Sequence, residues 1–197
     1  MSTDSRGAAT PVTAAGGQAP VTPIPAATVV PLRDGPRGLE VLLLKRNEAL
    51  VFAPGAWVFP GGRIDAGDYA AGGSDERDAA RTAACREAQE EAGLVLDPAS
   101  CRPFSHWTTP PHQPRRFSTW FFLADARHCD TVQVDEMEIV DFGWHAPAAA
   151  LQAAAAGALL LIRPTITTLR ELQDMPHTAG ALARAAERPP QVFAPNR

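Results

Sequence analysis

The chain has few cysteines, which argues against a disulfide-rich protein and against a zinc-thiolate protein. Its 197 residues include three cysteines, Cys85, Cys101 and Cys129, and no CxxC pair. A scattered, odd-numbered set of cysteines predicts neither a disulfide framework nor a thiolate zinc site. Free thiols fit a reducing compartment, so we expect a cytoplasmic protein.

The sequence also lacks a signal peptide and a long apolar run. Residues 1–25 are rich in Ala, Gly, Pro, Thr and Ser, and we expect a disordered tail there. The most apolar stretch, Ala146 to Ile162, is mostly alanine and is interrupted by Gly157. A membrane-spanning helix usually needs about 20 strongly apolar residues, so no membrane association is predicted and a helix packed on a sheet is expected instead.

An excess of positive charge is missing as well. The formal net charge is -4 and the pI is about 5.7, which disfavours nucleic acid as a partner. A small phosphorylated ligand remains compatible if a metal ion or a local basic pocket supplies positive charge. The length fits a single domain, which we place at residues 26–188, followed by a C-terminal tail over residues 189–197.

Strand-like and helix-like segments interleave without a regular βαβ alternation. Strands are expected at residues 27–33, 39–46, 57–59, 102–108, 116–124 and 138–144, and helices at 75–92, from 147, from 164 and at 179–187. This order predicts an α+β fold in which a mixed β-sheet is sandwiched between α-helices.

Three glutamates of the helix expected over residues 75–92 share one face. Glu87, Glu90 and Glu91 are spaced i, i+3 and i+4, so their carboxylates lie together and repel one another. Such a cluster belongs either on a solvated surface or around a cation. Because all the donors are oxygen atoms, the cation would be a hard ion such as Mg²⁺ or Mn²⁺.

The surrounding sequence resembles the Nudix box, G-x5-E-x7-R-E-U-x-E-E-x-G-U, where U is a bulky aliphatic residue. The segment REAQEEAGL matches its second half at Arg86, Glu87, Glu90, Glu91, Gly93 and Leu94. The resemblance implies a Nudix fold and a divalent-metal hydrolase that splits a phosphoanhydride bond in a nucleoside diphosphate linked to another group.

The first half of the box can be aligned in two ways. With Gly62 as the box glycine, Asp68 replaces the first glutamate and the loop carries ten additional residues. A contiguous alignment from Gly72 places Asp78 at the same position. We prefer Gly62, because the family places PGG after a Trp-x-Phe strand, while the role of this first acid stays open.

The resemblance also implies a role for each site residue. Glu90 and Glu91 would be the principal metal ligands, Glu87 a ligand or the general base, the Gly62 carbonyl a further ligand, and Arg86 the group that orients a glutamate. Some family members take the base from a later loop, and here the candidates are Asp135, Glu136 and Glu138.

The stretch Leu42 to Gly62 resembles the coenzyme A diphosphatase signature, L-L-T-K-R-S-x3-R-x3-G-x3-F-P-G-G. It departs from the signature at Leu44, Asn47 and Val51, where Thr, Ser and Arg are usual. Together with the enlarged loop, it implies the branch that includes peroxisomal coenzyme A diphosphatases.

On this basis the expected substrate is CoA or an acyl-CoA, cut to 3′,5′-ADP and a 4′-phosphopantetheine. ADP-ribose or another nucleotide sugar, and a non-catalytic nucleotide sensor, are the alternatives. The residues expected to contact the substrate are Arg46, Arg115, Arg116 and Trp107. A homodimer is left open.

Overall fold

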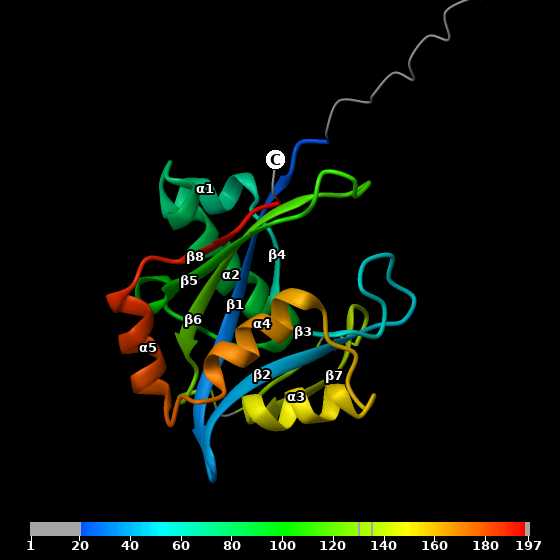
Figure 1. Cartoon of the computed structure of the whole chain (residues 1–197). Helices are drawn as coiled ribbons and strands as arrows, with labels where there is room; N and C mark the ends of the chain where they lie inside the picture. The colour runs from blue at the N-terminus through cyan, green and yellow to red at the C-terminus, as the bar shows by residue number, and fades with distance from the viewer. Residues whose placement is uncertain (1–20, 130, 135, 196–197) are drawn as a thin grey trace, which may run out of the picture.

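The computed structural model describes residues 21–129, 131–134 and 136–195 (Figure 1). Most of the tail expected over residues 1–25 therefore lies outside the described residues. Ile24 and Pro25, which the sequence analysis placed in that tail, belong to the first strand of the sheet.

Within the described residues, eight strands form one mixed sheet in the order β3-β2-β1-β6-β5-β8, with β4 paired to β1 and β7 paired to β2. The strands are β1 (Ile24–Gly35), β2 (Gly38–Arg46), β3 (Trp57–Val58), β4 (Gly61–Arg63), β5 (Arg102–Thr108), β6 (Phe117–Asp125), β7 (Ile139–His145) and β8 (Gln191–Phe193). The strands expected at residues 27–33 and 39–46 form a hairpin, because β1 and β2 pair antiparallel up to Gly35 and Gly38. In the centre of the sheet, β1 runs parallel to β6 from Ile24 opposite Phe117 to Leu32 opposite Asp125.

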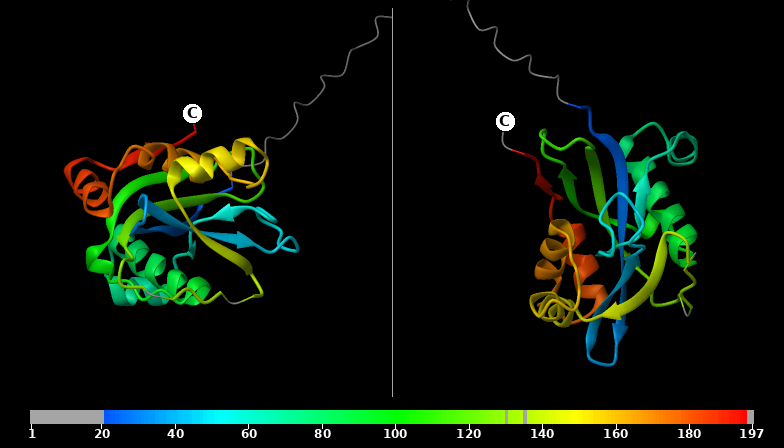
Figure 2. Two further views of the ribbon diagram at one scale, coloured as in Figure 1. Left: turned by 90° about the horizontal axis from the view of Figure 1, so that it is seen from below. Right: turned by 90° about the vertical axis from the view of Figure 1, so that its right-hand side faces the viewer.

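Helices cover both faces of this sheet, as predicted. They are α1 (Ala66–Gly72), α2 (Glu76–Ala92), α3 (Pro147–Ala155), α4 (Arg163–Leu172) and α5 (Thr178–Glu187), with a short 3-10 turn η1 (Pro98–Ser100) after α2. Figure 2 shows α1 and α2 on one side of the strands and α3, α4 and α5 on the other. The α+β fold with a mixed sheet between helical layers is therefore confirmed.

The two faces of the sheet carry separate hydrophobic cores. Along β2, Leu42 and Leu44 pack with the alanines of α2, whereas Val41 and Leu43 pack with α4 and α5. This division follows from the alternation of side chains along a strand. The alanine stripe of α2 is fully buried, so the helix axis comes close to the sheet.

The ends of α2 agree with the sequence signals. The Asp75 side chain accepts hydrogen bonds from the backbone N–H groups of Arg77 and Asp78, which is the N-cap geometry. Gly93 ends the helix with φ of 69°, in the left-handed region that favours glycine. Both ends of the helix that carries the box glutamates are thus fixed by local chemistry.

Four elements were not predicted, namely β4, α1, η1 and β8. The enlarged loop contains α1, and residues 189–197, expected as a tail, contain β8, which pairs parallel to β5. Trp107 of β5 stacks on Phe193 of β8 with a centroid separation of 3.9 Å, so aromatic packing holds this short strand in place.

In the described part of the chain, no helix reaches the length and apolar character that crossing a membrane requires. The alanine-rich stretch from Ala146 is divided into the nine-residue helix α3 and a turn at Gly157.

Candidate active site

The acidic face of α2 meets the sheet at two glycines of β4. The Gly61 N–H donates a hydrogen bond of 2.9 Å to Glu91 Oε2. A Cβ atom on Gly61 would collide with the Ala27 carbonyl oxygen, and one on Gly62 would collide with the Glu87 carboxylate. The two glycines therefore allow the carboxylates of α2 to reach the backbone of the sheet.

Glu91 is the most deeply placed of the three box glutamates, with 8% of its surface exposed. Burial raises the pKa of its carboxyl group to about 8, and the charge of Glu87 adds to this effect. The hydrogen bond from Gly61 and the charge of Arg46 oppose the rise in this pKa. A buried acid of this kind is the chemistry found where a protein holds a cation or a proton.

Glu87 and Glu90 are less buried than Glu91, and both pair with the guanidinium of Arg86. Arg86 Nη1 lies 2.9 Å from Glu87 Oε1 and 2.9 Å from Glu90 Oε2. The Glu90 side chain is 57% exposed, whereas burial raises the pKa of the Glu87 carboxyl group. The Arg86 guanidinium therefore neutralises the outer pair of carboxylates, as expected for a residue that orients a glutamate.

Asp68, and not Asp78, is the acid beside Arg86. Arg86 Nη2 and Nε lie 3.1 Å and 3.2 Å from the two oxygens of Asp68, which is only 3% exposed. These contacts raise the pKa of the Arg86 guanidinium above its usual range. Asp78 instead pairs with Arg81 on the same helix. The geometry favours the alignment that begins at Gly62.

Helix α1 is what brings Asp68 to this position. Asp68 and Asp65 form a reciprocal capping box, in which the Asp65 N–H donates to Asp68 Oδ2 at 2.8 Å. Asp65 also lies 3.9 Å from Arg86, a contact that the sequence analysis did not anticipate. The additional loop residues therefore fold into a helix that returns an acid to the box arginine.

Two further predicted residues, Arg46 at the end of β2 and Glu138 just before β7, act on Glu91 through their charges. The charges of Arg46 and Glu138 both act on the pKa of Glu91, in opposite directions. Arg46 Nε also donates to the Phe52 carbonyl at 3.1 Å, which holds the 47–56 loop against the end of β2. Glu136 is exposed with φ of 60°, and Asp135 lies outside the described residues.

Arg116 and Trp107, which the sequence predicts to contact the substrate, both make contacts within the protein. Arg116 is 8% exposed and donates hydrogen bonds to the carbonyls of Thr109 and Val21. The Trp107 indole is covered by Phe193 and donates to Ser105 Oγ. Arg115, the neighbour of Arg116, is exposed.

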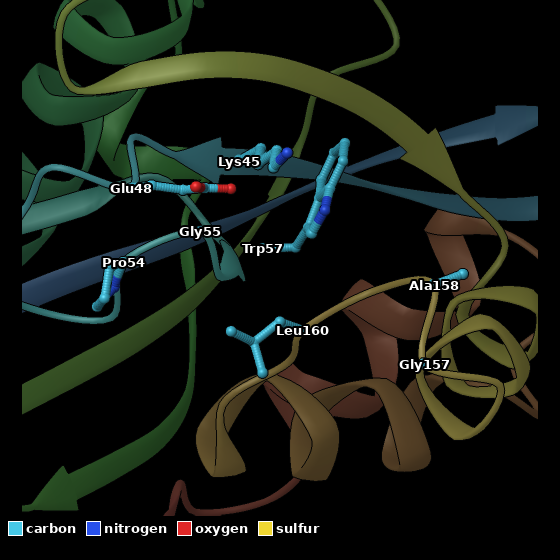
Figure 3. A pocket seen from close by; sticks show the side chains of 8 residues that line it. All are labelled: Lys45, Glu48, Pro54, Gly55, Trp57, Gly157, Ala158 and Leu160. Atoms are coloured by element: carbon cyan, nitrogen blue, oxygen red, sulfur yellow. The ribbon is translucent and has the colours of Figure 1, made fainter.

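An open pocket of about 580 Å³ lies at the end of β2 and does not include the box glutamates (Figure 3). Lys45, Glu48 and Trp57 line one side, and Gly157, Ala158 and Leu160 line the other. Lys45 pairs with Trp57 across β2 and β3, so both belong to the face that packs on α3 and α4. No sequence signal indicated that the α3–α4 turn would contribute to this pocket.

Among the described residues, no three His, Cys, Asp or Glu side chains converge as a ready-made metal cluster. The carboxylates of Glu87 and Glu90 instead both pair with the Arg86 guanidinium, which lies between them. The oxygen-rich donor set and the buried Glu91 nevertheless fit a hard divalent cation, which would compete with Arg86 for these carboxylates.

Comparison with known proteins identifies the family. A family model described as the NUDIX domain matches residues 22–163. The chain therefore belongs to the Nudix domain family. A curated relative, "Putative nudix hydrolase 7" of Caenorhabditis elegans, is 28% identical over an alignment of 171 positions, and the match covers 69% of this chain and 56% of that protein. The chain thus spans little more than half of the length of this relative.

Solved structures agree with the fold. A NUDIX hydrolase from Alicyclobacillus acidocaldarius is 25% identical, with a TM-score of 0.78 over 90% of this chain and 100% of that chain. The NUDIX domain of Shewanella oneidensis NrtR, solved with ADP ribose, is 17% identical with a TM-score of 0.55 over 77% of this chain and 88% of that one. At this identity the second likeness supports the fold alone.

Proposed function

We propose that this chain is a hydrolase that uses Mg²⁺ or Mn²⁺ to split a phosphoanhydride bond in a nucleoside diphosphate linked to another group. One observation carries the proposal: Glu91 is buried next to Glu87 beside Gly61 and Gly62 of β4, and burial raises the pKa of both carboxyl groups. A buried carboxylate is costly unless a cation or a proton compensates its charge.

The residues in place suit a hard divalent ion. Glu87, Glu90 and Glu91 would hold it through carboxylate oxygens, and the Gly62 carbonyl oxygen would add a neutral ligand. Such an ion, when bound, neutralises phosphate charge and lowers the pKa of a bound water. Arg86 would then keep its contacts with Asp68 and hold α1 against α2 while the glutamates turn to the ion.

Two residues are the preferred candidates for the general base. Glu87 lies in the box itself, and the charge of Glu138, just before β7, acts on Glu91. The Asn47 N–H donates to the Glu138 carbonyl at 2.8 Å, which fixes this segment beside the end of β2. Glu136 is the weaker candidate, because within the described residues it is not among the main charges that act on Glu91.

CoA or an acyl-CoA is the proposed substrate. The Leu42–Gly62 stretch, which resembles the coenzyme A diphosphatase signature, supplies both Arg46 near Glu91 and most of the residues that line the pocket. Lys45 lines the pocket and the charge of the consecutive Arg46 acts on Glu91, so the end of β2 offers one cation to each site. A substrate with its diphosphate near Arg46 could extend past this strand end, and the pocket would receive its far portion.

ADP-ribose or another nucleotide sugar is the second candidate. It is favoured by Val51, which stands where the signature has an arginine and is 93% exposed. The ADP ribose bound to the Shewanella oneidensis domain is in keeping with this alternative. Retention of all three box glutamates favours turnover over a purely sensory role.

A panel assay tests the function. The purified chain is incubated with Mg²⁺ or Mn²⁺ and with CoA, acyl-CoAs, ADP-ribose or dinucleotides, and the products are identified by mass. Release of 4′-phosphopantetheine supports CoA, whereas release of AMP and ribose 5-phosphate supports ADP-ribose. Tight binding without any product would leave only the nucleotide sensor.

Matched variants test the site. Glu91→Gln removes the buried charge with little change in shape, and kcat should fall by roughly 10³-fold or more, since a metal ligand contributes several kcal/mol of transition-state stabilisation. Glu76→Gln changes an exposed glutamate at the other end of the same helix and should leave kcat unchanged. Equal rates for Glu91→Gln and the unmodified chain would refute the site.

The pocket has its own test. Lys45→Ala and Trp57→Ala should raise KM for CoA by about tenfold, since each removes a contact worth about 1.4 kcal/mol, and should change KM for ADP-ribose little. If both substrates are affected equally, the pocket does not receive the pantetheine portion.

A further inference from the structure

We propose that Cys85 and Cys101 form an oxidisable thiol pair whose closure to a disulfide links the redox state of the chain to the box helix. Cys85 lies in α2 and Cys101 lies between η1 and β5. Their Sγ atoms are 3.6 Å apart, and both residues are buried.

The Cys85 and Cys101 sulfurs lie in van der Waals contact, and the position of Cys101 is fixed by η1. A disulfide has an S–S length of about 2.04 Å, so the two sulfurs need to approach by roughly 1.6 Å. Cys101 Sγ also lies 3.6 Å from the Asp97 carbonyl, at the turn that η1 forms. Cys129 contacts the Val95 carbonyl instead, at 3.8 Å. The geometry therefore selects one pairing among the three cysteines.

The two thiols contact each other directly inside the protein. Either sulfur can donate in this contact, so either thiol of the pair can supply the nucleophile.

With a peroxide as oxidant, the reaction is balanced in two steps. The thiolate of one cysteine attacks one peroxide oxygen, the O–O bond breaks, and a sulfenic acid forms while the other oxygen takes up a proton and leaves as water. The sulfur of the second cysteine then attacks the sulfenic acid sulfur, the S–O bond breaks, and the oxygen leaves as water with the proton of the second thiol. Two thiols are oxidised to one disulfide, and hydrogen peroxide is reduced to two waters.

The disulfide would affect the candidate active site because Cys85 is the residue before Arg86. Cys85 directly precedes Arg86, which holds Asp68, Glu87 and Glu90. Drawing Cys85 towards η1 would shift this arginine relative to β4, and displacements near 1 Å can lower a rate by about 10²-fold. This consequence rests on the proposed hydrolase function, whereas formation of the disulfide does not.

Peptide mapping tests the bond itself. The full-length chain is reduced, treated with hydrogen peroxide, alkylated and digested. A Cys85–Cys101 disulfide is expected in the unmodified chain and in Cys129→Ser, with a rise in Tm of roughly 5–10 °C, because a loop of about 15 residues is closed. Cys85→Ser and Cys101→Ala should each lose both the bond and the rise in Tm.

A bond to Cys129, oxidation of single cysteines only, or a persistent dithiol would each overturn the proposal. Activity is measured on the same samples. Oxidation should reduce hydrolysis about tenfold or more in Cys129→Ser, and a reductant should restore it. An unchanged rate in a chain that carries the mapped disulfide would overturn the link to the helix. A chain without any turnover would contradict the proposed function while leaving the mapped bond intact.

Discussion

At Arg86 a single guanidinium joins carboxylates from two helices. It pairs with Glu87 and Glu90 on its own helix and with Asp68 on α1. Since Asp68 is only 3% exposed, its charge depends on this arginine and on the Asp65 N–H. Asp68 therefore stabilises the position of Arg86 from inside the protein and is not exposed to solvent.

Substitution of the two candidate box acids distinguishes the alignments. Asp68→Asn keeps the shape but removes the charge that Arg86 pairs with, so we expect the free energy of unfolding to fall by about 1–3 kcal/mol and kcat to fall as Arg86 loses its position. Asp78→Asn, at a partly exposed pair with Arg81, should cost at most about 1 kcal/mol and leave kcat unchanged.

Urea denaturation and steady-state kinetics on both variants make the measurement. Similar losses in the two variants, or a larger loss in Asp78→Asn, would contradict the alignment from Gly62.

At the scale of single residues, the sequence was most informative where a local rule acts. The i, i+3, i+4 spacing predicted that Glu87, Glu90 and Glu91 share a face of one helix. It did not indicate that Trp107 is covered by Phe193, because that contact depends on how strands distant in sequence pair. Pair contacts of this kind have no periodic signal in a single sequence.

Among the elements, β8 shows how a short segment gains structure from its neighbours. Gln191–Phe193 is too short to be recognised from alternation and lies between prolines. It is placed because β5 offers an open edge and Trp107 offers a flat ring. Helix α1 escaped prediction for a related reason, since its capping box uses two aspartates and its sequence is rich in glycine.

Removal of the stacking ring tests the contribution of β8. Phe193→Ala should lower the free energy of unfolding by about 1–2 kcal/mol, or Tm by roughly 3–6 °C. The neighbouring Val192 is 69% exposed, so Val192→Ala should change stability by no more than about 0.5 kcal/mol. Thermal melts followed by circular dichroism provide the comparison. Equal melting of Phe193→Ala and the unmodified chain would show that β8 adds no stability.

Across the whole molecule, two half-buried histidines make stability sensitive to mild acid. Burial lowers the pKa of His106 and of His145, although Glu76 opposes the shift at His106 and Glu40 and Asp141 oppose it at His145. His106 contacts Ser118 and Trp120, and His145 packs on Trp57, where its Nε2 lacks a hydrogen-bond partner within the described residues.

The sign of the pH effect follows from these lowered values. Above the unfolded-state pKa of about 6.5, the imidazoles are neutral in both the folded and the unfolded chain. The histidines then make no pH-dependent contribution to the free energy of unfolding. As the pH falls below this value, the unfolded chain binds protons first, so stability decreases until the folded pKa is passed. Over the same range the raised pKa values of the Glu87 and Glu91 carboxyl groups act in the opposite direction, because the folded chain holds those protons more tightly. The histidine contribution is therefore a difference between two chains: in urea denaturation between about pH 7.5 and pH 5.5, the double variant His106→Gln, His145→Gln should retain more stability on acidification than the unmodified chain. An unchanged slope in the double variant would place the acid sensitivity elsewhere.

The position of the candidate metal site between two layers predicts that a bound ion stabilises the entire fold. Glu91 comes from α2, whereas Gly61 and Gly62 come from β4, so a cation held by both would join the helical layer to the sheet. An ion that binds only the folded chain, at about 100 times its Kd, adds about 2.7 kcal/mol to the free energy of unfolding, which corresponds to a rise in Tm of roughly 5–10 °C. Mg²⁺ or Mn²⁺ should produce this rise, and EDTA should reverse it. Glu91→Gln should show no rise while Glu76→Gln keeps it, because only the first residue reaches β4. If both variants respond to the ion like the unmodified chain, the ion binds elsewhere on the surface and the acidic face of α2 does not hold it.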